Sequence, residues 1–233
     1  MAQPSNSTSA HPKLQATRVW DLPTRLFHWA LAFCVIGSLI TGFLGGNAML
    51  WHFRFGYFVL TLLLFRIVWG FVGGTWSRFS SFIYAPKHVL HYLKGNREPL
   101  HEVGHNPLGG LSVLAMLSFL LAQVASGLIS DDEIAAAGPL TRFVANATVQ
   151  QASNYHVNIG KIILIILVVT HLLAIVFYWV KKRENLIKPM LHGDKVLPPN
   201  VLATRDTASS RAMAFIILAV CAVAVYGLVS LGG

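Results

Sequence analysis

The feature that most constrains this chain is an apolar stretch, Tyr155–Lys181, that carries two histidines. As a helix it would exceed the roughly 30 Å thickness of the hydrocarbon core of a bilayer. His156 and His171 would be separated by about 22 Å along its axis but by only about 60° around it. Both imidazoles would therefore point to broadly one side, one near a membrane face and one deeper. An ionisable side chain inside a membrane is costly and usually functional.

The composition indicates a membrane protein. Of the 233 residues, 55% are hydrophobic and 12% are charged, against about 25% charged in typical soluble domains. The net charge of +9 does not indicate a nucleic-acid partner, because the charges cluster between apolar runs, as topology determinants in contact with membrane lipid do. Cys34 and Cys221 lie in apolar runs without a C-x-x-C-H motif, which excludes covalent c-type haem attachment.

Five apolar segments are long enough to cross a bilayer as helices. They run approximately over residues Leu26–Leu44, His52–Gly73, Leu108–Ile129, Tyr155–Val180 and Ala212–Leu231. The predicted fold class is therefore an all-α membrane protein, a four-helix transmembrane bundle with a fifth C-terminal transmembrane helix. A short amphipathic helix is expected at Ala85–Gly95, and Ser130–Asn154 reads as a loop.

These segments predict four regions along the chain. Residues 1–17 are polar and are expected to form a disordered cytoplasmic tail. Residues 18–190 would form the main transmembrane domain. Residues 191–211 would be a cytoplasmic linker, and residues 212–233 an accessory transmembrane helix without histidine.

Lysine and arginine predict the orientation of the spans. They gather in the N-terminal segment, in the loop between spans two and three, and in the connection after span four. The positive-inside rule places these three segments in the cytoplasm. The N terminus is then cytoplasmic and the C terminus periplasmic in a multi-pass protein of a bacterial inner membrane.

This orientation sorts four histidines into two pairs by depth. His52 and His156 would lie near the outer face, and we name them the outer pair. His28 and His171 would lie nearer the cytoplasm, and we name them the inner pair. One mismatch remains: His171 is ten residues from Lys181, whereas His28 is close to the start of its span. Helix tilt, or spans that extend beyond the bilayer, would reconcile the two depths.

Two imidazoles that face each other across a bundle can take both axial positions of one haem iron. Two pairs would then hold two b haems, roughly 20 Å apart, stacked along the membrane normal. The competing interpretation is that each histidine is an isolated polar residue near a helix end. Matching depths for all four favour the haem interpretation.

Arg66 is a charged residue inside the second span, and it needs a partner or a route to the interface. A propionate of the inner haem would be such a partner. The alternative is snorkelling of the side chain to the cytoplasmic interface.

Several motifs resemble the bacterial cytochrome b561 family, which includes cytochrome b subunits of hydrogenases and formate dehydrogenases. The motifs are R-L-F-H-W at Arg25–Trp29, H-F-R-F-G at His52–Gly56, F-R-I-V-W-G at Phe65–Gly70, G-H-N-P-L-G at Gly104–Gly109, and the two histidines of span four. The resemblance covers roughly residues 18–190. It implies a four-helix bundle with two b haems, and axial ligands at His28, His52, His156 and His171. The fifth span departs from this pattern.

The resemblance also implies a function. Such proteins pass electrons between the quinone pool and a periplasmic redox partner, and a c-type cytochrome is our preferred partner here, with a dehydrogenase subunit as the alternative. The family's quinone site matches Asn106, which could equally be a helix-start residue. His105 could relay protons to that quinone. The sequence leaves open whether the chain is itself an enzyme and whether it forms a homodimer.

Three other functions remain as alternatives. The chain could be the cytochrome b subunit of a hydrogenase or other periplasmic dehydrogenase, or a stand-alone oxidoreductase of superoxide or quinol. A non-redox transporter or anchor fits less well, because transporters usually show repeated halves and broken helices, and neither is visible in the sequence.

Overall fold

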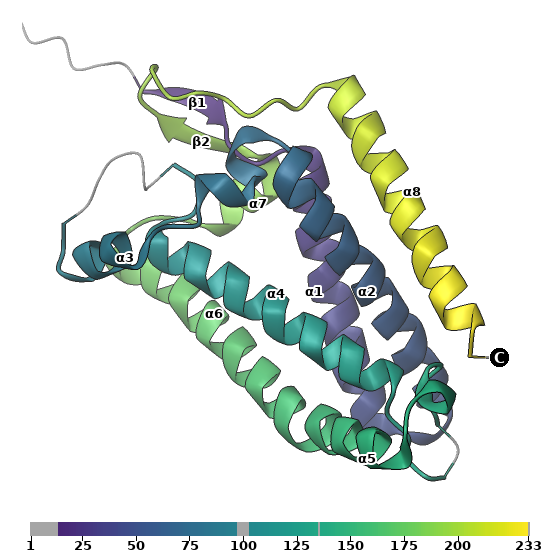
Figure 1. The fold of residues 1–233 in the computed structure, drawn as a ribbon. Helices are drawn as coiled ribbons and strands as arrows, with labels where there is room; N and C mark the ends of the chain where they lie inside the picture. Colours follow the sequence, from purple (N-terminus) through teal and green to yellow (C-terminus); the bar gives the residue numbers. More distant parts are fainter. Residues whose placement is uncertain (1–13, 97–102, 135, 233) are drawn as a thin grey trace, which may run out of the picture.

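The computed structural model describes residues 14–96, 103–134 and 136–232. Five of its helices are long and apolar enough to cross a membrane, as predicted. Figure 1 shows them as a tilted bundle with a small folded cap at one end, where β1 and α7 lie, and α5 at the other. Residues 1–13, which include most of the expected tail, lie outside the described part of the chain.

The main helices form two antiparallel pairs. α1 (Leu22–Leu44) packs along α2 (Met49–Val72), and α4 (Pro107–Leu128) packs along α6 (Lys161–Lys181). Within the described residues, α1 and α6 do not pack closely against each other, although they carry His28 and His171. The space between the two pairs of helices is where the histidines converge.

Local chemistry sets where α1 begins and ends. Asp21 caps its N terminus by accepting a hydrogen bond from the Thr24 backbone N–H at 2.8 Å, and Pro23 occupies the first turn, a position that suits proline. Gly45, with φ +63°, ends the helix, since glycine adopts this left-handed conformation at little cost. The predicted start of this span, Leu26, lies four residues after the observed start, Leu22.

The fourth span is longer than predicted. The loop expected at Ser130–Asn154 is wrong in its second half, where α5 (Asn146–Asn154) forms, and the chain continues through a π-helical segment, η6 (Tyr155–Gly160), into α6. A π-turn accommodates one additional residue. This insertion removes part of the roughly 60° offset between His156 and His171 that a regular α-helix would impose.

Shorter elements connect the spans. The expected short amphipathic helix is present as α3 (Pro86–Leu93). The remaining short helical elements are η1 (Gly46–Ala48), η2 (Thr75–Ser77), η3 (Phe79–Ser81), η5 (Thr141–Phe143) and α7 (Ile187–His192).

The predicted tail and linker meet in the cap. β1 (Gln15–Arg18) pairs antiparallel with β2 (Asp194–Leu197), with Ala16 opposite Val196. Residues 15–17, expected in a disordered tail, are thus part of a strand, and residues 191–211 are more ordered than a linker. The reason is that β1 pairs with β2, which is far away in the sequence. A strand gains its inter-strand backbone hydrogen bonds only when a second strand lies beside it.

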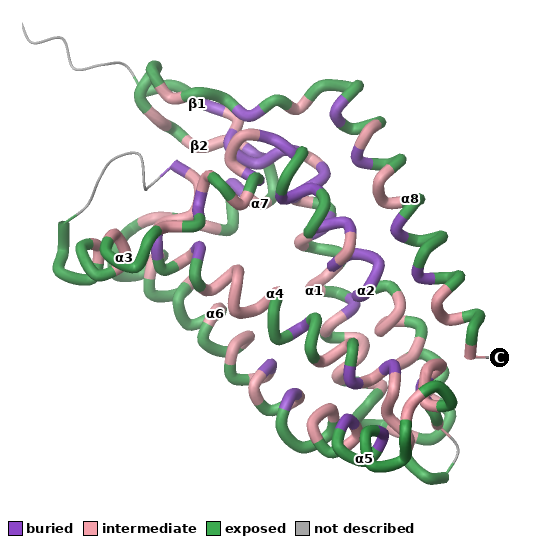
Figure 2. Tube along the Cα trace, viewed as in Figure 1, coloured by how far each residue is buried: buried purple, intermediate pink, exposed green. Residues whose placement is uncertain are grey.

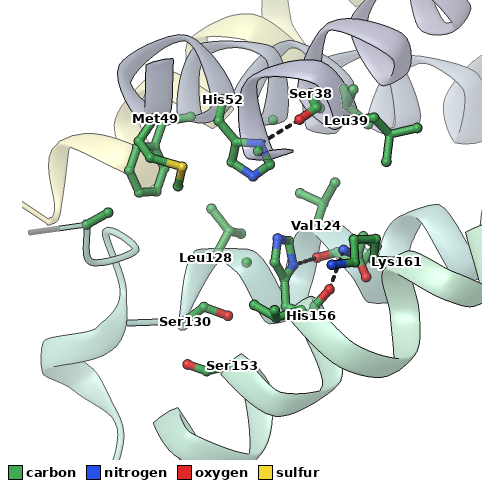
Figure 3. Close-up of a pocket in the computed structure, with 18 of the residues that line it drawn as sticks. Ser38, Leu39, Met49, His52, Val124, Leu128, Ser130, Ser153, His156 and Lys161 are labelled. Atoms are coloured by element: carbon green, nitrogen blue, oxygen red, sulfur yellow. Dashed lines mark hydrogen bonds between the residues drawn. The ribbon is translucent and has the colours of Figure 1, made fainter. Parts of the chain in front are cut away.

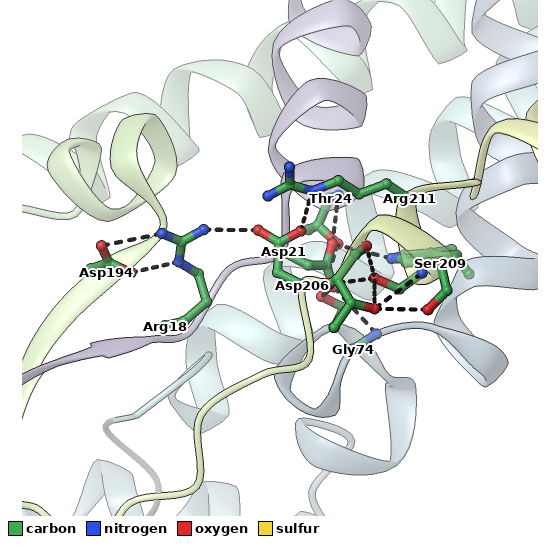
Figure 4. Close-up of polar contacts among 12 residues, drawn as sticks. Arg18, Asp21, Thr24, Gly74, Asp194, Asp206, Ser209 and Arg211 are labelled. Carbon is green, nitrogen blue, oxygen red and sulfur yellow. Dashed lines mark hydrogen bonds and ion pairs between the residues drawn. The ribbon is translucent and has the colours of Figure 1, made fainter. Parts of the chain in front are cut away.

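Arg18 ties this cap together. Its guanidinium bonds Asp194 at 2.5 Å and Asp206 at 2.8 Å, and Arg211 reaches Asp206 from the other side at 2.8 Å (Figure 4). Burial by itself would raise the pKa of Asp206, but hydrogen bonds from Arg211, from the Leu22 backbone and from Arg18 outweigh it, so that pKa lies below its ordinary value.

The fifth span, α8 (Ala208–Ser230), leaves this cap and packs mainly along α2, with lesser contact to α1. Its buried side chains include Ala214, Cys221 and Val225. Its opposite face is exposed, as the alternation of purple and green along α8 shows in Figure 2. The helix therefore lies on the outside of the bundle.

Candidate functional site

The outer pair lies between α2 and the π-helical segment. The ring centres of His52 and His156 are 5.9 Å apart, and their planes are nearly perpendicular at 89°. Figure 3 shows the two imidazoles facing each other across an open space. They come from opposite pairs of helices, so a group held between them would join the two layers of the bundle.

The inner pair lies nearer the cap. The ring centres of His28 in α1 and His171 in α6 are 6.4 Å apart, with 51° between their planes. The depth mismatch noted in the sequence has a visible cause, because α6 continues well past His171. Its Tyr178 lies level with Asn106, the residue that caps the start of α4, and accepts a hydrogen bond from it.

The separations of both pairs fit two axial ligands on one metal ion. An imidazole nitrogen lies about 2 Å from a bound metal, and the ring centre about 1 Å further, so two opposed imidazoles have centres about 6 Å apart. Both observed separations, 5.9 Å and 6.4 Å, agree with this estimate. The four predicted histidines are therefore brought together in the two predicted pairs.

In each outer histidine, one ring nitrogen is hydrogen-bonded to a backbone carbonyl. Nδ1 of His52 lies 2.8 Å from the Ser38 carbonyl, and Nδ1 of His156 lies 2.8 Å from the Gln123 carbonyl. A carbonyl can only accept, so Nδ1 carries the hydrogen in both rings and Nε2 keeps its lone pair. A hydrogen bond of this kind fixes the tautomer and raises the basicity of a metal-ligating histidine.

Glycines leave room for both outer rings. A Cβ added at Gly127 would lie 2.7 Å from Cε1 of His156, and one added at Gly42 would lie 3.0 Å from Nδ1 of His52. These two α-helical positions accept no larger residue without displacing an imidazole.

A cavity of about 240 Å³ surrounds the outer pair. Its lining is mostly apolar, and the residues labelled in Figure 3 come from α1, α2, α4 with the loop that follows it, and the fourth span. Lys161 lines it too, with its ammonium group 5.2 Å from the centre of the Phe43 ring. An apolar cavity with a few convergent polar groups is the usual form of a cofactor site.

Arg66 is buried, with 3% of its surface exposed. Its guanidinium lies 5.0 Å from the centre of the Phe79 ring and 5.8 Å from that of Phe82. Nη1 has no hydrogen-bond partner among the described residues. A buried guanidinium nitrogen without an acceptor is costly. The side chain is enclosed by protein, and this does not fit the snorkelling alternative.

His105 lies beneath the cap, next to Arg66. Its ring is 4.7 Å from the ring centres of both Trp20 and Phe82. Burial and then the positive charge of Arg66 lower its pKa to about 3, with smaller effects from Lys195 and the inner pair. The imidazole is therefore neutral at physiological pH, and its Nδ1 has no partner among the described residues.

Asn106 is the N-cap of α4. Its Oδ1 accepts a hydrogen bond from the Gly109 backbone N–H at 2.8 Å, as the helix-start interpretation predicted. Its Nδ2 donates to the Tyr178 hydroxyl at 2.7 Å, which lies 3.0 Å from the Tyr92 hydroxyl. Sequence reasoning missed these two tyrosines as neighbours of Asn106, and no motif marks either of them.

Gln123 was also missed, although a signal was present. It is a polar residue within the apolar third span, which is the same kind of anomaly that identified the histidines. The structure places it against His156.

Comparison with known proteins settles the family. Residues 19–193 match the family described as prokaryotic cytochrome b561. The chain belongs to this family. It is therefore a multi-pass membrane cytochrome b that binds haem b and transfers electrons, as the resemblance of its motifs implied.

Several relatives, all named as B-type cytochrome subunits, support this assignment. The chain is 26% identical over 212 residues to the probable Ni/Fe-hydrogenase B-type cytochrome subunit of Bradyrhizobium diazoefficiens, covering 76% of this chain and 85% of that one. The corresponding protein of Rhizobium leguminosarum bv. viciae is 26% identical, with 78% and 90% covered. That of Azotobacter vinelandii is 31% identical over a shorter stretch, 43% of this chain and 53% of its own.

Proposed function

We propose that this chain is a dihaem cytochrome b that carries electrons across a bacterial inner membrane, between the quinone pool and the catalytic subunit of a Ni/Fe-hydrogenase. The observation that carries the proposal is the arrangement of four histidines as two opposed pairs at different depths between the two helix pairs. The two b haems would supply one-electron redox chemistry at these two depths.

The residues of the chain have distinct roles in this proposal. His52 and His156 would hold the outer haem through Nε2, because their Nδ1 atoms are bonded to backbone carbonyls. His28 and His171 would hold the inner haem. Arg66 would bind an inner propionate, since its unpartnered Nη1 and its burial call for an anionic acceptor.

The quinone site would lie at the cap end, beside the inner pair. Asn106, Tyr178 and Tyr92 form a chain of hydrogen bonds there, which offers hydroxyl groups to a quinone oxygen. His105 is neutral, and so it could donate a hydrogen bond but would not store a proton as imidazolium.

The hydrogenase partner is supported by the relatives, whose names include a Ni/Fe-hydrogenase. This partner replaces the c-type cytochrome preferred from the sequence. The c-type cytochrome stays a second candidate because α8, which begins after the matched residues 19–193, departs from the four-span pattern.

Haem quantification tests the cofactor part of the proposal. The purified chain should yield two non-covalent b haems, measured by extraction and by a reduced-minus-oxidised spectrum. A single haem, or none, would contradict the dihaem arrangement.

A reduction experiment tests the partner. Membranes from a host that produces the chain should show its b-haem absorption on addition of hydrogen, and deletion of the hydrogenase catalytic subunit should abolish this response. Reduction that survives the deletion but requires a co-purifying c-type cytochrome would favour the second candidate.

A further inference from the structure

We propose that Gln123 is a positioning residue, which sets the rotation and the protonated nitrogen of His156 and thereby tunes the outer site. The inference rests on the proposed ligation by His156. It concerns a residue outside the four histidines, and it assigns a purpose to the π-helical segment.

Gln123 contacts His156 through both its backbone and its side chain. Its backbone carbonyl accepts a hydrogen bond from Nδ1 of the His156 ring at 2.8 Å, and its side-chain Nε2 donates to the His156 backbone carbonyl at 2.9 Å. One residue of α4 thus holds both the ring and the main chain of the histidine. Two fixed points on opposite ends of a residue restrict its χ1 rotation as well as its position.

The π-helical segment makes these two hydrogen bonds possible. A π-turn replaces the regular i→i+4 hydrogen bonds by i→i+5 bonds, and side chains that insert into the helical ladder are a known cause of local distortion. Here the inserted group is the Gln123 amide, bonded to a carbonyl within Tyr155–Gly160.

Gly160 provides the space for that amide. An added Cβ at this position would overlap Oε1 of Gln123 and would lie 2.8 Å from Cε1 of Tyr155. Gly160 is buried, and a larger residue there would have to displace the Gln123 amide.

Ser126 completes the arrangement one turn further along α4. Its hydroxyl donates to the Gln123 carbonyl at 2.9 Å and lies 3.3 Å from Nδ1 of His156. The carbonyl that orients the ring is itself held in place by this bond, so the position of the acceptor does not depend on the ring.

The consequence is chemical as well as geometric. A histidine that donates Nδ1–H to a well-placed carbonyl is a more basic ligand, which stabilises the oxidised form of a bound iron and lowers its reduction potential. Loss of the Gln123 side chain would let the π-turn relax, lengthen the ring-to-carbonyl bond, and raise the potential of the outer haem.

The first test is Gln123→Met, which keeps the length of the side chain but removes its hydrogen bonds. We expect two haems per chain, a higher midpoint potential for one of them, and a changed low-spin ferric EPR signal for that same haem. Gln151→Met is the matched control, because Gln151 is exposed on α5. Gln151→Met should alter neither the midpoint potential nor the EPR signal.

The second test disturbs the contact between Gln123 and His156 by a substitution at Gly160. Gly160→Ala should displace the Gln123 amide and reproduce the shift, whereas Gly227→Ala should not, since nothing lies within 4 Å of a Cβ added at Gly227. In a Gln123→Ala background the Gly160 substitution should shift the potential less than it does in the original chain, because Oε1 of Gln123 is gone and only the contact with the Tyr155 ring remains.

Three outcomes would overturn the inference. They are an unchanged potential and EPR signal in both Gln123→Met and Gly160→Ala, an equal shift at both haems, and a loss of thermal stability without any spectral change. Retention of two haems in His156→Leu would instead refute the ligation by His156, and hence part of the proposed function itself.

Discussion

At the scale of single residues, the inner and outer histidines differ in how they are held. His52 and His156 each donate to a backbone carbonyl, whereas Nδ1 of His28 is buried without a partner among the described residues. A buried nitrogen of this kind is costly, and this cost supports the proposal that a haem is bound at the inner pair.

His171→Leu tests the separation of the two sites. The variant should lose the inner haem and keep the outer one, so that extractable haem falls by about half. The reason is that His52 and His156 share no contact with the inner pair and are held by their own carbonyls. Loss of both haems in a chain that still inserts would contradict independent sites.

Arg66→Gln tests the buried charge. Removal of a positive charge next to the inner site should lower the midpoint potential of the inner haem, because the oxidised iron carries more positive charge than the reduced iron. Potentiometric titration would measure it. Arg54→Gln is the control, since Arg54 is exposed and lies over Trp51 at the far end of α2, and it should leave that potential unchanged.

At the scale of elements, the packing of α8 is open to a direct test. Ala214 is 5% exposed and faces the core, whereas Val223 is 71% exposed. Ala214→Leu should therefore overpack the contact with α2 and destabilise the protein by about 1–3 kcal/mol. Val223→Leu, on the outer face, should leave the melting temperature in detergent unchanged. Equal effects of the two would mean that α8 does not pack as described.

The β1–β2 cap should respond to acid through Asp206. Its pKa is lower in the folded protein than its ordinary value, so the charged form stabilises the fold above about pH 4, and this contribution is lost as the pH falls through the lowered pKa. The Arg18–Asp206 pair is partly buried, and its loss should cost on the order of 1 kcal/mol.

Thermal melting between pH 7 and pH 3 would measure this dependence. Asp206→Asn should be less stable than the original chain at pH 7, and the two should converge at low pH. A difference that stays constant over the whole range would rule out this carboxylate as the titrating group.

At the scale of the whole molecule, the predicted orientation is testable. If each of the five apolar helices crosses the membrane, the two termini lie on opposite sides of it. The distribution of Lys and Arg predicts a cytoplasmic N terminus. A reporter enzyme that folds only in the periplasm should therefore be active when fused after residue 233 and inactive when fused before residue 1. The reverse pattern would exchange the names of the outer and inner pairs.

Much of this arrangement could be predicted because it depends on local properties of the chain. Span lengths follow from apolar runs, and the depth of each histidine follows from its distance to a span end at a fixed rise per residue. These two facts were sufficient to pair His52 with His156 and His28 with His171. Rotation about a helix axis could not be predicted equally well, since a π-turn leaves no clear mark in sequence.

The sequence by itself determined the class of protein, its five spans and the partners of its four histidines, because bilayer thickness and helical rise are constants that any chain must satisfy. Tertiary structure alone decided that residues 15–18 and 194–197 form one sheet, that Gln123 forms hydrogen bonds with His156, and that α8 lies along α2. These contacts join residues far apart in the chain. They depend on how side chains pack across helices, and no local pattern encodes that.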